Sequence, residues 1–93
     1  MTFSHLEFIS RAEIDLQTLE VWIDEEWVVP QGAPDAPEFT EADLARARLI
    51  QDLIRDLGVN PEGVGVALHL IDQVHDLRNA LADVIGQARQ SGG

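Results

Sequence analysis

Apolar side chains recur with helical spacing in four stretches of the sequence, and this pattern predicts four helices. The first helix is expected over residues 4–11, because Ser4 followed by Glu7 has the spacing of a capping box. Phe3 stands ahead of the cap, where a hydrophobic staple would lie. The side chains of this stretch expected to face inward are Leu6, Phe8 and Ile9.

A second helix is expected over residues 15–27, after a turn at residues 12–14, because Asp15 is a favourable N-cap. Two short helices joined by a tight turn resemble a helix-turn-helix pair. At about 100° per residue, Leu16, Leu19 and Ile23 form one apolar face. The opposite face, expected to point outward, carries Gln17, Thr18, Val21, Asp24 and Glu25, with Trp22 on its flank.

Residues 31–38, with the sequence QGAPDAPE, interrupt the helical pattern. Their prolines and glycine exclude a helix and predict a loop, which would form a mobile wing. A third helix is then expected from Thr40 to Leu57, with Thr40 and Asp43 as a second capping box and Gly58 as its stop. Its apolar stripe contains Leu44, Ala47, Leu49, Ile50, Leu53, Ile54 and Leu57.

The fourth helix is expected to be long, starting at the Asn60 cap and running to about Arg89, roughly 45 Å at the usual rise per residue. From Leu70 onward its apolar residues alternate in steps of four and three, which is the pattern of a coiled-coil seam. This seam would either fold back on the chain's own core or pair with a second copy. We expect self-association, because the helix is longer than the small globular body that could cover it. The seam consists of Leu70, Val74, Leu77, Leu81, Val84 and Ala88.

Length and charge narrow the class of protein. Ninety-three residues suit one domain over residues 1–93, with the short helices and wing at 3–58, the long helix at 60–89 and a frayed tail at 90–93. The chain carries 17 acidic and 6 basic residues, a net charge of −11 that repels phosphate backbones and anionic lipid and attracts cationic proteins. Solubility alone is the alternative explanation of this charge. Without cysteine, a signal sequence or a membrane-length apolar run, the expected location is the cytoplasm.

Sequence patterns of catalysis and metal binding are weak. His69 and His75 are six residues apart and point in different directions on a helix, so with Asp72 and Asp76 they do not predict a metal site. Ser4 and Thr40 already serve as helix caps, and no glycine-rich phosphate loop or nucleophile elbow is present. We therefore expect neither an enzyme nor a cofactor.

The second helix is acidic where a DNA reader would be basic. Residues 13–26 contain six carboxylates and no lysine or arginine, and Arg11 is the only base in the first 45 residues. Duplex recognition requires cations for the phosphates and donors for base edges, so we expect no binding of nucleic acid. An outward valine and tryptophan among acids instead favour docking of a basic protein.

Three segments resemble known regulators. WIDEEWVVP (22–30) and FTEADLARARLIQDLIRDLGVNPEGV (39–64) are similar to the MerR-type winged-helix pattern, and GVGVALHLIDQVHDLRNAL (63–81) resembles the family of CbpM-type chaperone modulators. The similarity covers about residues 3–85. It implies an all-α, MerR-like winged helix-turn-helix with four helices, a minimal β wing and a long C-terminal helix.

The resemblance to CbpM-type modulators further implies a partner, a J-domain co-chaperone of the CbpA/DnaJ type whose activity the chain would inhibit. No membrane partner is expected, whereas a homodimer through the C-terminal helix is. The alternatives are a MerR-type DNA-binding transcription regulator that dimerises through the same helix, and a coiled-coil scaffold without regulatory function. From charge rather than from the family, the expected partner-binding residues are Gln17, Glu20, Val21, Trp22, Asp24, Glu25 and Glu26.

Overall fold

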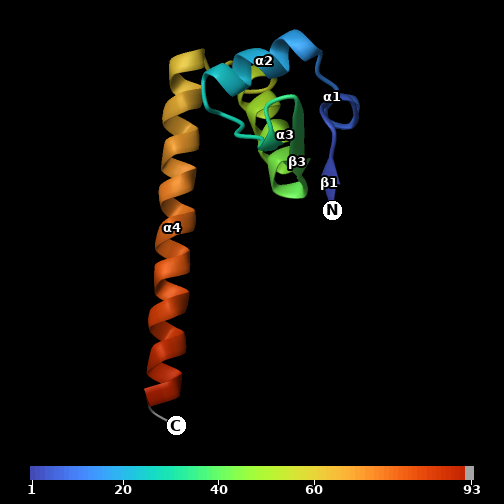
Figure 1. Ribbon diagram of the computed structural model, residues 1–93. Helices are drawn as coiled ribbons and strands as arrows, with labels where there is room; N and C mark the ends of the chain where they lie inside the picture. The colour runs from blue at the N-terminus through green and yellow to red at the C-terminus, as the bar shows by residue number, and fades with distance from the viewer. Residues whose placement is uncertain (92–93) are drawn as a thin grey trace.

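The chain folds into a small helical body from which one long helix projects (Figure 1). The computed structural model describes residues 1–91, and over this range it contains four helices and three short strands. The expected winged helix-turn-helix class is confirmed, with a long C-terminal helix. In chain order the elements are β1 (Thr2–Phe3), α1 (His5–Ala12), α2 (Leu16–Asp24), β2 (Gln31–Ala33), β3 (Ala36–Thr40), α3 (Glu41–Arg55) and α4 (Pro61–Ser91).

The predicted helix caps are present. Ser4 and Glu7 exchange hydrogen bonds at the start of α1, and Thr40 and Asp43 do so at the start of α3. The Asp15 carboxylate accepts the Thr18 N–H at 2.7 Å, and the Asn60 side chain accepts the Gly63 N–H at 2.8 Å. Each cap uses residues three apart, so the sequence alone specifies these helix starts.

The second helix is shorter than the sequence predicts, because it ends at Asp24 instead of Trp27. Glu26 adopts a left-handed backbone with φ of 61°, which turns the chain out of the helix. The N–H groups of Trp27 and Val28 then both donate to the carbonyl of Trp22, at 2.9 and 3.4 Å. These bonds direct Trp27 and Val28 into the core.

Residues 31–38, whose prolines predict a loop, form a β-hairpin, which is the minimal β wing that the resemblance implies. Strand β3 pairs antiparallel with β2 on one side and with β1 on the other, in the order β1-β3-β2. Strand β1 pairs only with Phe39 and Thr40 of β3. One side of β3 is therefore unpaired at Pro37, and proline is tolerated at such an edge because it has no N–H to donate. The chain therefore has an ordered wing held to the body by its own N-terminus.

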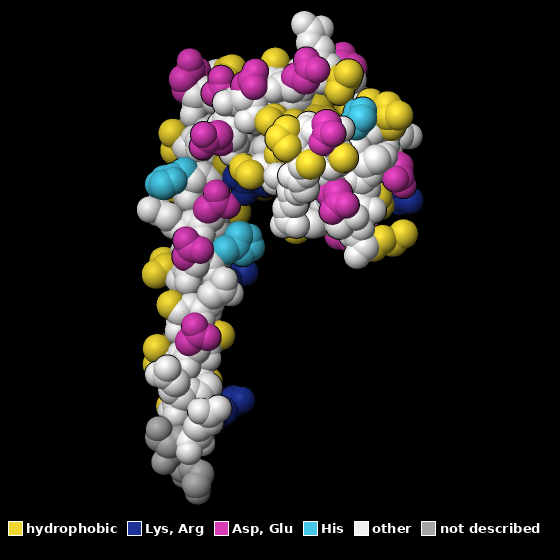
Figure 2. Space-filling model, viewed as in Figure 1, with side chains coloured by type: hydrophobic (Ala, Val, Ile, Leu, Met, Phe, Trp, Pro, Cys, Tyr) yellow, Lys and Arg dark blue, Asp and Glu magenta, His cyan; other side chains and the backbone are white. Residues whose placement is uncertain are grey.

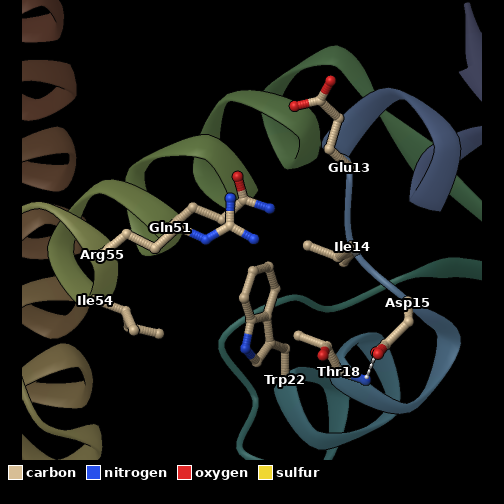
Figure 3. A pocket seen from close by; sticks show the side chains of 8 residues that line it. All are labelled: Glu13, Ile14, Asp15, Thr18, Trp22, Gln51, Ile54 and Arg55. Atoms are coloured by element: carbon tan, nitrogen blue, oxygen red, sulfur yellow. Dashed lines mark hydrogen bonds between the residues drawn. The ribbon is translucent and has the colours of Figure 1, made fainter.

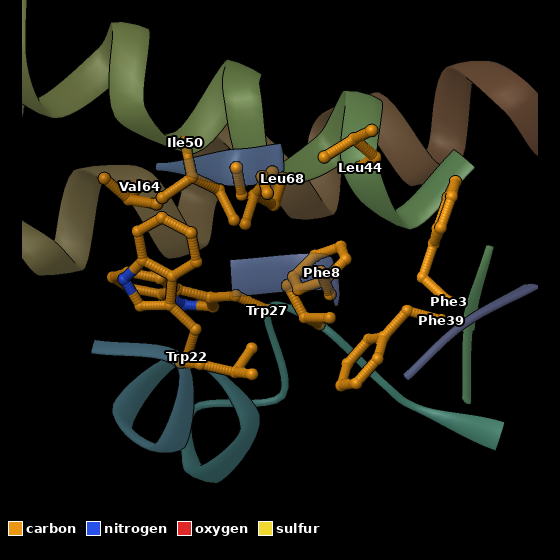
Figure 4. Packing of buried hydrophobic residues seen from close by; sticks show 13 residues of the cluster. Phe3, Phe8, Trp22, Trp27, Phe39, Leu44, Ile50, Val64 and Leu68 are labelled. Carbon is orange, nitrogen blue, oxygen red and sulfur yellow. The ribbon is translucent and has the colours of Figure 1, made fainter. Parts of the chain in front are cut away.

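The core lies between α1, α2, the hairpin and α3, and the first turns of α4 close it (Figure 4). The rings of Phe8 and Phe39 stack with centroids 4.4 Å apart.

Several residues that the sequence predicts to face inward are exposed instead. Leu6 is 64% exposed, because the short α1 turns only Phe8 and Ala12 fully toward the core. The others are Leu16, Ile54 and Leu57, which are 45, 39 and 71% exposed. Leu57 lies beyond α3, because this helix ends at Arg55 and not at Leu57 as the sequence predicts.

Helix α4 packs on the body through Val64 and Leu68 and then leaves it (Figure 1). Gly63 is favoured in the first turn of α4, because a Cβ there would meet the side chain of Val59, just ahead of the helix, at 2.7 Å. All seam positions from Leu70 to Val84 are exposed, by 46 to 70%, so the seam does not fold back on the chain's own core. Of the expected frayed tail, Gln90 and Ser91 belong to the helix, and residues 92–93 lie outside the described residues.

Candidate protein-docking surface

The outward face of α2 is built largely as the sequence predicts. Acidic side chains form a row along the top of the body in Figure 2, over α2. Val21 lies among them and is 51% exposed, which provides an apolar contact point. The predicted partner-binding residues that the structure leaves exposed are Gln17, Glu20, Val21, Asp24, Glu25 and Glu26.

Trp22 is the exception, and its prediction as an outward contact residue is wrong. Its side chain is only 4% exposed and belongs to the core. On the helical wheel Trp22 lies about 60° from Leu19, so a slight rotation of α2 toward α3 brings both side chains inward. Burying the large indole recovers more apolar area than burying Leu16, which is left half-exposed.

The Trp22 indole forms one wall of a hollow of about 300 Å³ between α2 and α3 (Figure 3). The opposite side of this hollow carries Gln51, Ile54 and Arg55 from α3. Gln51 is held in place because its amide donates to the carbonyl of Ala12 at 2.6 Å. Glu13 and Asp15 also line this hollow, so it too contains carboxylates.

The carboxylates of the α2 face are free of internal ion pairs. Within residues 1–91 the one ion pair joins Arg46 and Asp72, far from this face in the sequence. The nearest base in the sequence, Arg11, is placed over the ring of Phe3 at 4.8 Å. The Thr18 hydroxyl, followed by the Thr18 N–H, lowers the pKa of Asp15, so this carboxylate keeps its charge in mildly acidic solution. The negative charge is therefore available to a partner.

An apolar trough between α2 and the β2–β3 hairpin was missed by the sequence analysis. Two hollows of about 330 and 390 Å³ adjoin there, and both are lined by Ile23, Pro34 and Pro37. Leu16 extends the trough along α2, and buried Phe39 lies beneath it. The signal in the sequence was the presence of two prolines in the wing, Pro34 in the turn and Pro37 in β3, which give the hairpin apolar side chains beside α2.

The described residues contain no group of three potential metal ligands in one place. Asp72, which the sequence places near both histidines of α4, is bonded to Arg46. None of the helices in residues 1–91 combines the length and apolar character that crossing a membrane requires.

The order and packing of the elements are those of a winged helix-turn-helix: α1 and α2 form the helical pair, the β2–β3 hairpin is the wing, and α3 and α4 follow. A family profile described as "MerR HTH family regulatory protein" matches residues 3–84, nearly the whole chain. No curated protein and no solved structure matches the chain. The matched family is one of regulators, not of enzymes. The chain therefore belongs to the MerR helix-turn-helix family of regulatory proteins.

Proposed function

We propose that this chain is a non-enzymatic modulator that binds the basic J-domain of a CbpA/DnaJ-like co-chaperone and inhibits its co-chaperone activity. The observation that carries the proposal is the acidic face formed by α2 and the turn after it, where Glu20, Asp24, Glu25 and Glu26 are exposed and unpaired within the described residues. The resemblance of residues 63–81 to CbpM-type modulators supplies the class of partner.

Charge and apolar contact have different parts in this interaction. Complementary charge accelerates association by about 10- to 1,000-fold and discriminates against acidic partners. Exposed rim charges contribute less to the lifetime of a complex, which depends on buried apolar anchors. Because Trp22 is in the core, the apolar contact must come from Val21 and its exposed neighbours instead.

DNA binding is the alternative that membership of the MerR family itself favours. In helix-turn-helix proteins the second helix enters the major groove, and its neighbours contact phosphates. Here that helix offers carboxylates, and neither α2 nor the β2–β3 hairpin contains a lysine or arginine. A duplex would meet repulsion at both elements, which is why we place protein binding first.

The proposed modulator is also expected to form a homodimer through α4. The support is the exposed seam from Leu70 to Val84, which has a regular heptad spacing and no cover from the chain's own body. In water such a stripe is stabilised by pairing with another helix.

The deciding experiment titrates the purified chain with the isolated J-domain of a CbpA/DnaJ-like co-chaperone and, separately, with DNA duplex. We expect J-domain binding whose association rate falls as salt is raised. The double variant Asp24→Lys, Glu25→Lys should slow association at least tenfold. The matched control Asp76→Lys, Asp83→Lys makes the same charge change on exposed positions of α4 and should retain most of the rate.

Two results would contradict the proposal. One is duplex binding tighter than micromolar at physiological salt without J-domain binding, which would identify a DNA-binding regulator. The other is J-domain binding that the α2 double variant leaves unchanged, which would exclude the acidic face as the contact surface.

Inhibition of the co-chaperone is measured separately, as loss of J-domain-stimulated ATP hydrolysis by the DnaK-type chaperone.

A further inference from the structure

The trough between α2 and the hairpin is lined mainly by apolar side chains. Its two hollows share Ile23, Pro34 and Pro37, so they form a continuous apolar strip instead of two separate sites. Figure 2 shows apolar side chains gathered on the body below the acidic row, with acidic side chains among and around them. Each hollow has a volume at the lower end of that typical for ligand pockets, about 300–1,000 Å³.

Carboxylates border this strip on both sides. Glu20 lines it from α2, and Asp35 lines it from the turn of the hairpin. Neither hollow is lined by a lysine or arginine, and His5 is the one ionisable group besides the two acids. An apolar floor between two acidic rims is complementary to an apolar stripe flanked by cations.

We propose that the trough receives the apolar stripe of a basic amphipathic helix from the partner protein, with the lysines or arginines beside that stripe reaching Glu20 and Asp35. The inference rests on the proposed function and deepens it, because it adds to Val21 a second apolar contact beside the acidic face. In this mode the partner helix lies along α2, inserting side chains between Leu16 and Ile23 on one side and Pro34 and Pro37 on the other.

Rigid walls favour this mode of binding. Phe39 and Leu19, beneath the trough, are buried at 0 and 1% exposure, so its floor is part of the folded core. The two prolines have fixed φ angles and lose little freedom when a helix packs on them. A preformed groove of this kind binds an amphipathic helix through anchors at helical spacing.

The test uses two probes on the full chain labelled with ¹⁵N. The first is the isolated J-domain, and the second is a synthetic peptide of about 15 residues with a leucine stripe flanked by lysines at helical spacing. A peptide of the same composition with scrambled order is the control. With the J-domain and the ordered peptide we expect amide shifts concentrated at residues 16–23 and 31–37, and at least tenfold weaker binding of the scrambled peptide.

A pair of matched variants adds an affinity measurement. Leu16 and Leu57 are both exposed leucines, at 45 and 71%, but only Leu16 lines the trough. Leu16→Gln should weaken both probes by about tenfold, as for an apolar anchor, and Leu57→Gln by less than twofold. Amide spectra of both variants show directly whether the fold is retained.

The outcomes separate this inference from the proposed function. J-domain binding with amide shifts confined to α4 overturns the trough as the docking site and leaves the modulator function standing. Ordered-peptide binding in the trough without any J-domain binding supports the trough and overturns the J-domain as partner. Equal binding of the ordered and scrambled peptides shows that charge alone acts, and overturns the inference.

Discussion

The guanidinium of Arg46 in α3 donates two hydrogen bonds to the carboxylate of Asp72 in α4, at 2.7 and 3.2 Å. The Nε–H of the same arginine donates to the backbone carbonyl of Trp27, in the turn that follows α2. One side chain thus joins three segments that are distant in the sequence. Through it, the direction in which α4 leaves the body is coupled to the end of the acidic helix.

Asp72→Asn should lower stability at neutral pH by a small amount, about 0.2–1 kcal/mol, because the pair is partly exposed. Hydrogen bonding to Arg46 lowers the pKa of Asp72 below its ordinary value of 3.8 in the folded state. The stabilisation is therefore fully present above pH 3.8 and is lost as the pH falls through the folded-state pKa. Denaturant unfolding of wild type and variant across this range measures it.

Asp76→Asn is the control for this prediction, because Asp76 is exposed on the same helix and has no ion-pair partner in residues 1–91. It should shift stability less than Asp72→Asn at neutral pH. A stability difference between wild type and Asp72→Asn that persists unchanged in strong acid would show that the ion pair is not its cause.

Glu26→Gly should stabilise the protein by about 0.5–1 kcal/mol. Glu26 has a φ of 61°, a left-handed conformation that costs L-residues about 1–2 kcal/mol and glycine almost nothing. Glu25→Gly removes the same charge at a neighbouring position with φ of −79° and should destabilise instead. Thermal unfolding of the two variants separates backbone strain from charge, and equal shifts of Tm would refute the strain explanation.

Trp22→Ala should destabilise the fold by about 3–5 kcal/mol, because it removes a large buried side chain from the contact between α2 and α3. Trp22→Phe retains most of the apolar volume and should cost clearly less. Urea unfolding followed by far-UV circular dichroism provides both values. If Trp22→Ala kept wild-type stability and lost only partner binding, the tryptophan would be a contact residue after all.

Leu77→Asp should convert a dimer into monomers, because it places a charge in the middle of the exposed seam of α4. Asn79→Asp adds the same charge two residues away, off the seam, and should leave the mass unchanged. Sedimentation equilibrium over a range of protein concentrations distinguishes them. Identical masses for wild type and Leu77→Asp would refute pairing through this face.

The parts of the fold that the sequence revealed are those set by local contacts. The caps at Ser4, Asp15, Thr40 and Asn60 each bond a group three residues away, and all were predicted correctly. The family pattern supplied the winged helix-turn-helix class, which the matching family profile confirms. Local signals therefore specified where most elements begin.

The errors arose where distant residues decide the structure. Whether Trp22 or Leu16 is buried depends on the rotation of α2 about its axis relative to α3. The spacing of apolar residues in α2 does not determine this rotation. Residues 31–38 read as a loop because of their prolines, and only the family resemblance indicated a β wing there. The strand that pairs with the far end of β3, Thr2–Phe3, lies at the other end of the domain in sequence. The trough could not be anticipated for the same reason, since its two walls come from separate elements. The outward acidic positions were predictable because only exposure was required of them.

The exposure of the second part of α4 determines how fast its amide protons exchange. From Asp72 to Arg89 every residue except Gly86 is exposed, so the backbone hydrogen bonds of this stretch receive no protection from the body. A solitary helix of this length opens readily in water, and its amide protons should exchange with deuterium quickly in dilute protein. Pairing of two such helices would slow that exchange, whereas a ligand on α2 would protect only the globular end. Deuterium uptake along a single chain thus reports assembly and docking as two separate signals.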